Sequence, residues 1–161
     1  MKIIFDASSA INLINGAALS VTLNLSTHVF LIGPQARGEC AAQIVEIDRE
    51  IACGALNLFD DSQVSSTLFV ETLALHNLGL GETECLVFAE VDPELSICCD
   101  DGRARAIAKK LIGPPRVVGS LFLLRECVRA GILSVSEAYT SFLQMRTKGA
   151  FLPDLDSGYF L

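Results

Sequence analysis

The chain has 161 residues, a length that fits one domain, residues 1–161, with a core large enough to fold without disulfide or metal staples. Its net charge of −7 is unevenly placed, because residues 1–101 hold fifteen acidic and three basic side chains, whereas residues 103–148 hold nine basic and two acidic. The acidic part can bind cations and the basic part can bind a phosphate backbone, although charged helix surfaces explain the pattern equally well.

The six cysteines include no C-x-x-C pair, which argues against a zinc site. The short apolar run of MKIIFDASS argues against a signal peptide, so we expect a cytoplasmic protein.

The first expected strand is KIIFD, residues 2–6, which ends in a carboxylate. Residues 7–36 follow without any Asp, Glu, Lys or Arg, but Asn, Ser, Thr and His interrupt the stretch, so no window of about 20 mostly apolar residues remains. We therefore expect no membrane span here. Residues 28–32, HVFLI, predict a second strand that stops at a Gly-Pro pair, and we interpret the rest of the stretch as buried structure that includes a homodimer face.

Helical and strand-like patterns then alternate to the end of the chain. Residues 35–53 repeat apolar side chains near a period of 3.6, which predicts one long helix with Pro34 in its first turn. Further strands are expected at residues 56–59, 95–99 and 116–119, and further helices at 63–78, 81–91, 101–111, 120–129 and 134–148. Such alternation predicts an α/β fold with a parallel sheet covered by helices on both faces.

Acidic side chains follow two of the expected strands. Asp6 comes directly after the first strand, and the doublet Asp100 and Asp101 comes after the fourth. In open parallel sheets, ligands gather beyond the carboxyl ends of the strands, so these carboxylates converge if the two strands are neighbours. Asp6 is the hardest to explain otherwise, because a charge at the end of a central strand is costly unless it is partnered.

Three more acids, Glu39, Glu82 and Glu84, lie near the beginnings of expected helices, from which they can point toward the same edge of the sheet. Crowded carboxylates repel one another and are tolerated when a hard cation such as Mg²⁺ or Mn²⁺ neutralises them. Each acid also has a purely structural explanation: Asp101 as a helix N-cap, and the glutamates as favourable charges at a helix N-terminus.

Five segments, taken in their order and spacing, resemble the PIN-domain nucleases, and in particular the ribonuclease toxins of prokaryotic toxin–antitoxin pairs. They are FDASSAI, GPQARGEC, LGLGETECLVFAE, SICCDDGRARAIAKKL and VVGSLFLLRECVRAGIL. The resemblance implies a three-layer α/β/α sandwich with a parallel sheet of about five strands in the order 3-2-1-4-5. It also implies hydrolysis of single-stranded RNA with Mg²⁺ or Mn²⁺, an antitoxin protein as partner, and a homodimer.

The resemblance further implies a set of carboxylates that are both catalytic residues and metal ligands. The doublet departs from the lone aspartate usual in the family, and the third acid, more often aspartate elsewhere, has two registers. The implied residues are Asp6, Glu39, Glu82 and Asp101, with Asp100 as the alternative to Asp101 and Glu84 as the alternative to Glu82.

Two further residues are assigned by the same resemblance and by position. Ser8 falls where the family often has Ser or Thr beside the first aspartate, a place from which it can support a ligand. Arg103 is the basic residue nearest the doublet and can contact a substrate phosphate, although it also fits a plain solvated helix face. A catalytically inactive PIN-like module that binds RNA or protein is the alternative to the nuclease.

Overall fold

The computed structural model describes residues 1–161, apart from the side chain of Gln63. Five parallel strands form one sheet in the order β3-β2-β1-β4-β5. The strands are β1 (Lys2–Phe5), β2 (Val29–Ile32), β3 (Asn57–Leu58), β4 (Leu95–Cys98) and β5 (Val117–Val118). The fold class and the strand order that the sequence predicts are therefore confirmed, with β3 and β5 shorter than expected.

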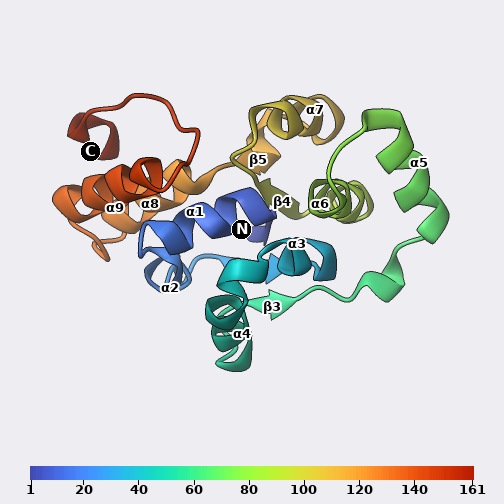
Figure 1. Ribbon diagram of the computed structural model, residues 1–161, viewed down its shortest axis with the longest axis horizontal. Helices are drawn as coiled ribbons and strands as arrows, with labels where there is room; N and C mark the ends of the chain where they lie inside the picture. Colours follow the sequence, from blue (N-terminus) through green and yellow to red (C-terminus); the bar gives the residue numbers. More distant parts are fainter.

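Helices surround this sheet (Figure 1). At one end of the molecule lie α8 and α9, and at the opposite end lies α5, which packs on α6. The helices are α1 (Ala7–Asn15), α2 (Leu19–Thr22), α3 (Pro34–Glu39), α4 (Ile44–Ala52), α5 (Ser66–His76), α6 (Leu80–Val91), α7 (Gly102–Ile112), α8 (Ser120–Arg129) and α9 (Val135–Thr147), with 3-10 turns η1 (Ala41–Gln43), η2 (Asp61–Gln63), η3 (Pro114–Arg116) and η4 (Ser157–Phe160).

The sheet separates two apolar cores, because successive side chains of a strand point to opposite faces. Ile3 and Phe5 of β1 face a core built with α1, α2, α8 and α9. Ile4, between them in the sequence, faces a second core built with α6 and α7. All three side chains are fully buried, so each contributes roughly 1.5–3 kcal/mol of transfer free energy. This burial on both faces makes β1 the central strand and fixes the position of the residue that follows it.

The single helix expected over residues 35–53 is wrong, because the chain turns after Glu39. Cys40 has a ψ of 33°, and its amide donates to the carbonyl of Arg37, three residues back, at 3.1 Å. Gly38 weakens the helix at this point, and the buried Cys40 turns the chain into η1 and α4. The apolar period continues through the turn, so the sequence pattern does not show where the helix ends. Val45 belongs to that period but is 76% exposed.

Residues 7–36 form α1, α2, β2 and the start of α3, and much of this uncharged stretch is buried against the sheet. Across the part of the chain that the structure describes, no helix combines the length and apolar character needed to cross a membrane. The six cysteines are free thiols, and all except the exposed Cys53 are buried, as expected of small apolar side chains.

Candidate active site

Asp6 lies at the carboxyl end of the central strand and is the N-cap of α1. Its Oδ1 accepts hydrogen bonds from the amides of Ser8 and Ser9, the second at 3.3 Å. The residue is only 1% exposed, yet its Oδ2 accepts no hydrogen bond among the residues that the structure describes. A buried carboxylate oxygen without a partner is costly, so Oδ2 is the atom of this region that most clearly lacks a ligand.

The pKa of Asp6 is raised, first because burial disfavours the charged carboxylate. The thiol of Cys99 and the amides of the following residues lower the pKa in part. The thiol has a single proton, which it donates to the carbonyl of Asp101 at 3.8 Å, so Oδ2 of Asp6 receives no hydrogen bond among the described residues. A cation beside Oδ2 would offset the cost of the buried charge.

Glu39 and Glu82 come from α3 and α6, and both reach the N-terminus of α6. Oε2 of Glu82 accepts the amide of Gly79 at 2.9 Å, and Oε1 of Glu39 accepts the amide of Gly81 at 3.1 Å. A Cβ on residue 79 would lie 3.5 Å from that oxygen of Glu82 and 3.7 Å from that oxygen of Glu39. The two carboxylates therefore approach one point, and glycine at position 81 leaves room for Glu39, because a Cβ there would lie 2.6 Å from its Oε2.

The charges of the other predicted acids also affect the pKa of Glu82. Its pKa is raised by burial and then by the charges of Asp6, Asp101 and Glu39, although the amide of Gly79 lowers it. Asp6 and Glu82 line one small cavity, otherwise largely apolar, between α6 and α7. The structure thus places Glu82 within electrostatic reach of Asp6, Glu39 and Asp101.

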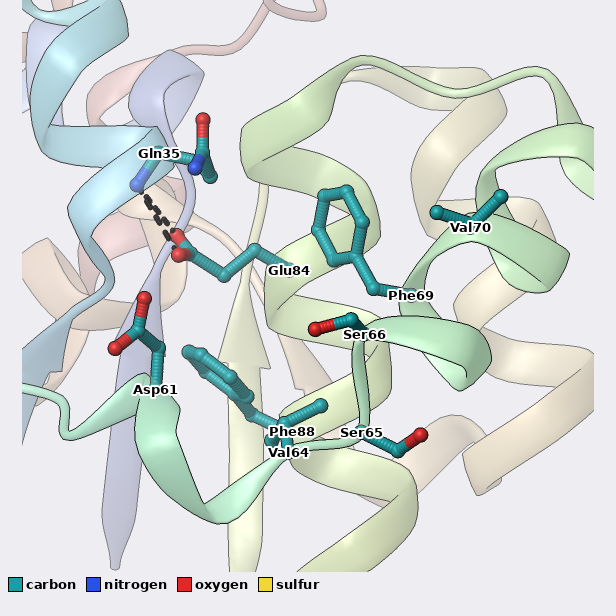
Figure 2. A pocket seen from close by; sticks show the side chains of 9 residues that line it. All are labelled: Gln35, Asp61, Val64, Ser65, Ser66, Phe69, Val70, Glu84 and Phe88. Carbon is teal, nitrogen blue, oxygen red and sulfur yellow. Dashed lines mark hydrogen bonds between the residues drawn. The ribbon is translucent and has the colours of Figure 1, made fainter.

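Glu84 lies on the same helix as Glu82 but points to the beginning of α3 (Figure 2). Its carboxylate accepts the amides of Gln35 and Ala36, each at 3.1 Å, and caps that helix from outside. Burial raises the pKa of Glu84, while these amides lower it. Figure 2 shows Glu84 in a pocket with Phe69, Phe88 and Asp61, on the side of the sheet's edge near β3. Its contacts are those of a structural residue.

The two acids of the doublet have different environments. Oδ2 of Asp100 accepts from Nδ2 of Asn12 at 2.8 Å, and its Oδ1 accepts the amide of Ser120 at 2.9 Å, so both oxygens are engaged. Asp101 is exposed and is the N-cap of α7, with Oδ1 accepting the amide of Ala104 at 2.8 Å. The charge of Asp101 raises the pKa of Glu82.

Polar residues of α1 connect the two strand ends. The amide of Asp100 donates to Oγ of Ser8 at 3.1 Å, and Oγ of Ser9 donates to the carbonyl of Cys98 at 2.6 Å. Ser8 therefore contacts both strand ends, because its amide also donates to Oδ1 of Asp6, and its role beside a bound ligand stays a prediction. Asn12 is not among the predicted site residues, although a polar residue one turn after two serines on a mostly apolar helix is a signal that indicates it.

Arg103 is predicted to contact substrate, but its guanidinium contacts the C-terminus of α5. Nη1 and Nη2 donate to the carbonyls of Asn77 and His76, at 3.0 and 2.9 Å, which are among the last carbonyls of α5. This arrangement gives Arg103 a helix-capping contact, and its role toward a phosphate stays a prediction.

The donor set fits a divalent cation in its chemistry. Carboxylate oxygens are the ligands that Mg²⁺ and Mn²⁺ prefer, and Oδ2 of Asp6 is buried and free. As the side chains now lie, no three His, Cys, Asp or Glu residues within the described part of the chain are close enough to hold a metal ion. The long side chains of Glu39 and Glu82 would have to rotate away from the amides of α6, at a cost of about 1–3 kcal/mol per hydrogen bond.

The comparison with protein families agrees with this geometry. The family model described as DUF3368: PIN domain matches residues 2–155, which include every strand and every acid discussed above. Searches of curated proteins and of solved structures found no match to the chain. With a parallel sheet in the order 3-2-1-4-5 and a family match over nearly its whole length, the chain belongs to the PIN domain family.

Proposed function

We propose that this protein is a metal-dependent endoribonuclease that hydrolyses phosphodiester bonds of single-stranded RNA. PIN domains are generally nucleases that use divalent metal ions, and the acids of this chain lie where the fold gathers ligands. The observation that carries the proposal is Asp6, a buried carboxylate at the end of the central strand with one oxygen that lacks a partner.

In this proposal four carboxylates, Asp6, Glu39, Glu82 and Asp101, would hold Mg²⁺ or Mn²⁺. When bound, such an ion supplies Lewis-acid chemistry for the hydrolysis of a phosphodiester. The chain's own contribution is to place the acids: the first turn of α1 holds Oδ1 of Asp6, while α3 and α6 carry the two glutamates, which would turn from the amides of α6 to the ion. Asp100, with both oxygens engaged, positions the loop that carries Asp101.

A second candidate function, a non-catalytic module, has its own supporting observation. All four acids already accept backbone amides at helix N-termini, and the described side chains form no ready group of three metal ligands. If that arrangement is kept in solution, the acids serve as caps, and the PIN fold binds RNA or protein without cutting it.

Cleavage of a mixed pool of single-stranded RNA separates the two candidates. We expect the purified protein to cut the pool with Mg²⁺ or Mn²⁺, to leave 5′-phosphate ends, and to stop when EDTA is added. Asp6→Asn and Glu82→Gln should abolish cleavage, whereas Glu90→Gln, an exposed residue of the same helix, should not. RNA that is bound but stays intact in every lane would support the non-catalytic module.

We extend the proposal to the partners of a toxin: a small antitoxin protein and a second copy of this chain. The support is α5, on which the apolar side chains of Val70 and Leu75 are 61% and 77% exposed. Large apolar side chains exposed on one helix are of the kind that a protein partner covers. Sedimentation of the wild type beside Leu75→Glu tests the homodimer, since a dimer through α5 should dissociate in the variant. An unchanged sedimentation coefficient would contradict that interface.

A further inference from the structure

The cavity that Asp6 and Glu82 share is too small for a hydrated metal ion. Its volume is about 10 Å³, and its walls are mostly apolar. One water molecule needs roughly 10–15 Å³, so the cavity has room for about one water. Mg²⁺ usually keeps several of its waters, and in a nuclease it must also be open to a phosphate. A metal ion can therefore reach the buried carboxylate of Asp6 only if part of the wall moves.

One part of that wall comes from a short connecting segment, residues 77–79, between α5 and α6. Leu78 of this segment lines the cavity and packs against the core on that face of the sheet. The other lining residues belong to α6, to α7 and to the ends of β1 and β4. The segment leaves the end of α5 beside α7 and leads into α6 (Figure 1). Movement of this segment would uncover the cavity without breaking a helix or a strand.

The helix that precedes the segment is only weakly attached to the rest of the molecule. Among the 11 residues of α5, all of which the structure describes, Thr72 alone is buried. The helix packs on α6, and the apolar side chains of Val70 and Leu75 are exposed. Elements with little buried apolar surface open at a lower free-energy cost than the core does. We therefore expect α5 and the connecting segment to move more easily than α6 or α7.

Arg103 holds the beginning of the segment in place. Its Nη1 donates to the carbonyl of Asn77 at 3.0 Å, and its Nη2 donates to the carbonyl of His76 at 2.9 Å. Within the described part of the chain, no other side chain donates a hydrogen bond to residues 76–78. Arg103 belongs to α7, which supplies Ala104 and Ala108 to the opposite wall of the cavity. Its two hydrogen bonds therefore join the movable wall to a fixed one.

We infer that Arg103 is a positioning residue that controls access to the acid site. With its two hydrogen bonds in place, Leu78 covers the cavity, and without them α5 and residues 77–79 move away and admit a metal ion to Asp6. The inference rests on the proposed function for the identity of the ion that enters. It differs from the predicted contact of Arg103 with a phosphate, because loss of such a contact would leave the affinity for metal unchanged.

Labelling of the cavity thiols with iodoacetamide in EDTA, followed by mass spectrometry, tests the inference without metal or RNA. Cys85 and Cys99 line the cavity and are 0% and 2% exposed. Arg103→Ala should label both about three- to tenfold faster, because the hydrogen bonds of the closed form are lost. Cys127, buried in the core on the opposite face of the sheet, should label at the wild-type rate. Lys110→Ala, which removes another exposed cation of α7, is the matched control and should label like the wild type.

A titration with Mn²⁺ then links the opening to the ion. Its apparent affinity should rise in Arg103→Ala by the same factor as the labelling rates, because both depend on the fraction of open molecules. Equal labelling of Cys99 in the wild type and in Arg103→Ala would overturn the inference, whether or not the protein cuts RNA. An equal acceleration of Cys127 would also overturn it, because the substitution would then have destabilised the whole fold. Faster labelling of Cys99 alone, with no Mn²⁺ bound by either protein, would support the closure by Arg103 and remove the proposed function.

Discussion

Replacing Glu84 by alanine is expected to destabilise the fold by releasing the N-terminus of α3. The carboxylate is 2% exposed and accepts the amides of Gln35 and Ala36 at 3.1 Å. These amides belong to the first turn of α3, where a helix supplies no partners of its own. Alanine would leave both amides without the acceptor that now satisfies them.

The size of the effect follows from two opposing contributions. Hydrogen bonds to a charged group contribute about 1.5–3 kcal/mol each, and two of them are lost. Burial opposes this gain, because it raises the pKa of Glu84 and so makes its charged form costly. We expect a net loss of about 3 kcal/mol in the free energy of unfolding. For a domain of this length, that loss lowers Tm by roughly 6–12 °C.

Thermal unfolding at neutral pH, followed by circular dichroism, measures the change. Glu90→Ala is the control, because Glu90 lies exposed on the same helix and its loss should change stability by less than about 0.5 kcal/mol. If Glu84→Ala and Glu90→Ala unfold at the same temperature, the carboxylate of Glu84 does not hold α3, and the distinction drawn between Glu82 and Glu84 loses its basis.

Two further predictions concern stability. Gly33→Ala should lower Tm, because its Cβ would lie 2.0 Å from Oε2 of Glu84, whereas Gly38→Ala on the same helix has open space and should raise Tm slightly; equal shifts would contradict the close approach at Gly33. Asp92→Asn removes the ion pair with Lys2 (2.5 Å), whose hydrogen bond lowers the pKa of Asp92. Because the pKa of Asp92 is lower in the folded state, the pair stabilises the protein when the pH is above the unfolded-state pKa near 4, by at most about 1 kcal/mol. This stabilisation is lost as the pH falls through the folded-state pKa. Urea unfolding of both proteins should therefore differ at neutral pH and agree in acid, and a difference that persists in acid would refute the ion pair as its cause.

Much of the fold could be predicted because its signals are local. The run KIIF is short, apolar and followed by Asp6, so it predicts a buried strand with a charged residue at its end. Ser134 and Glu137 form the capping box that their spacing predicts for α9. The break after α3 could not be predicted in the same way, because the burial of Cys40 and the packing of α3 against α6 are tertiary effects.

For the candidate site, the residue order predicts that the acids lie at the carboxyl ends of the strands, but it does not show which backbone groups each acid contacts. Glu82 and Glu84 are two residues apart on one helix, and only the position of α3 shows that Glu84 meets its amides. The doublet is divided likewise: Ser120 and Asn12, from distant parts of the chain, engage Asp100 and leave Asp101 at the start of α7. Such partners follow from strand order and packing rather than from residue spacing.

The measurement that tests the central claim most directly is a titration with Mn²⁺ followed by electron paramagnetic resonance of the free ion. We expect saturable binding to the wild type, loss of binding in Asp6→Asn and Glu82→Gln, and retention in a folded Glu84→Gln variant. Binding that survives in Asp6→Asn, or a wild type that binds no Mn²⁺, would contradict the assignment of these carboxylates as a metal site.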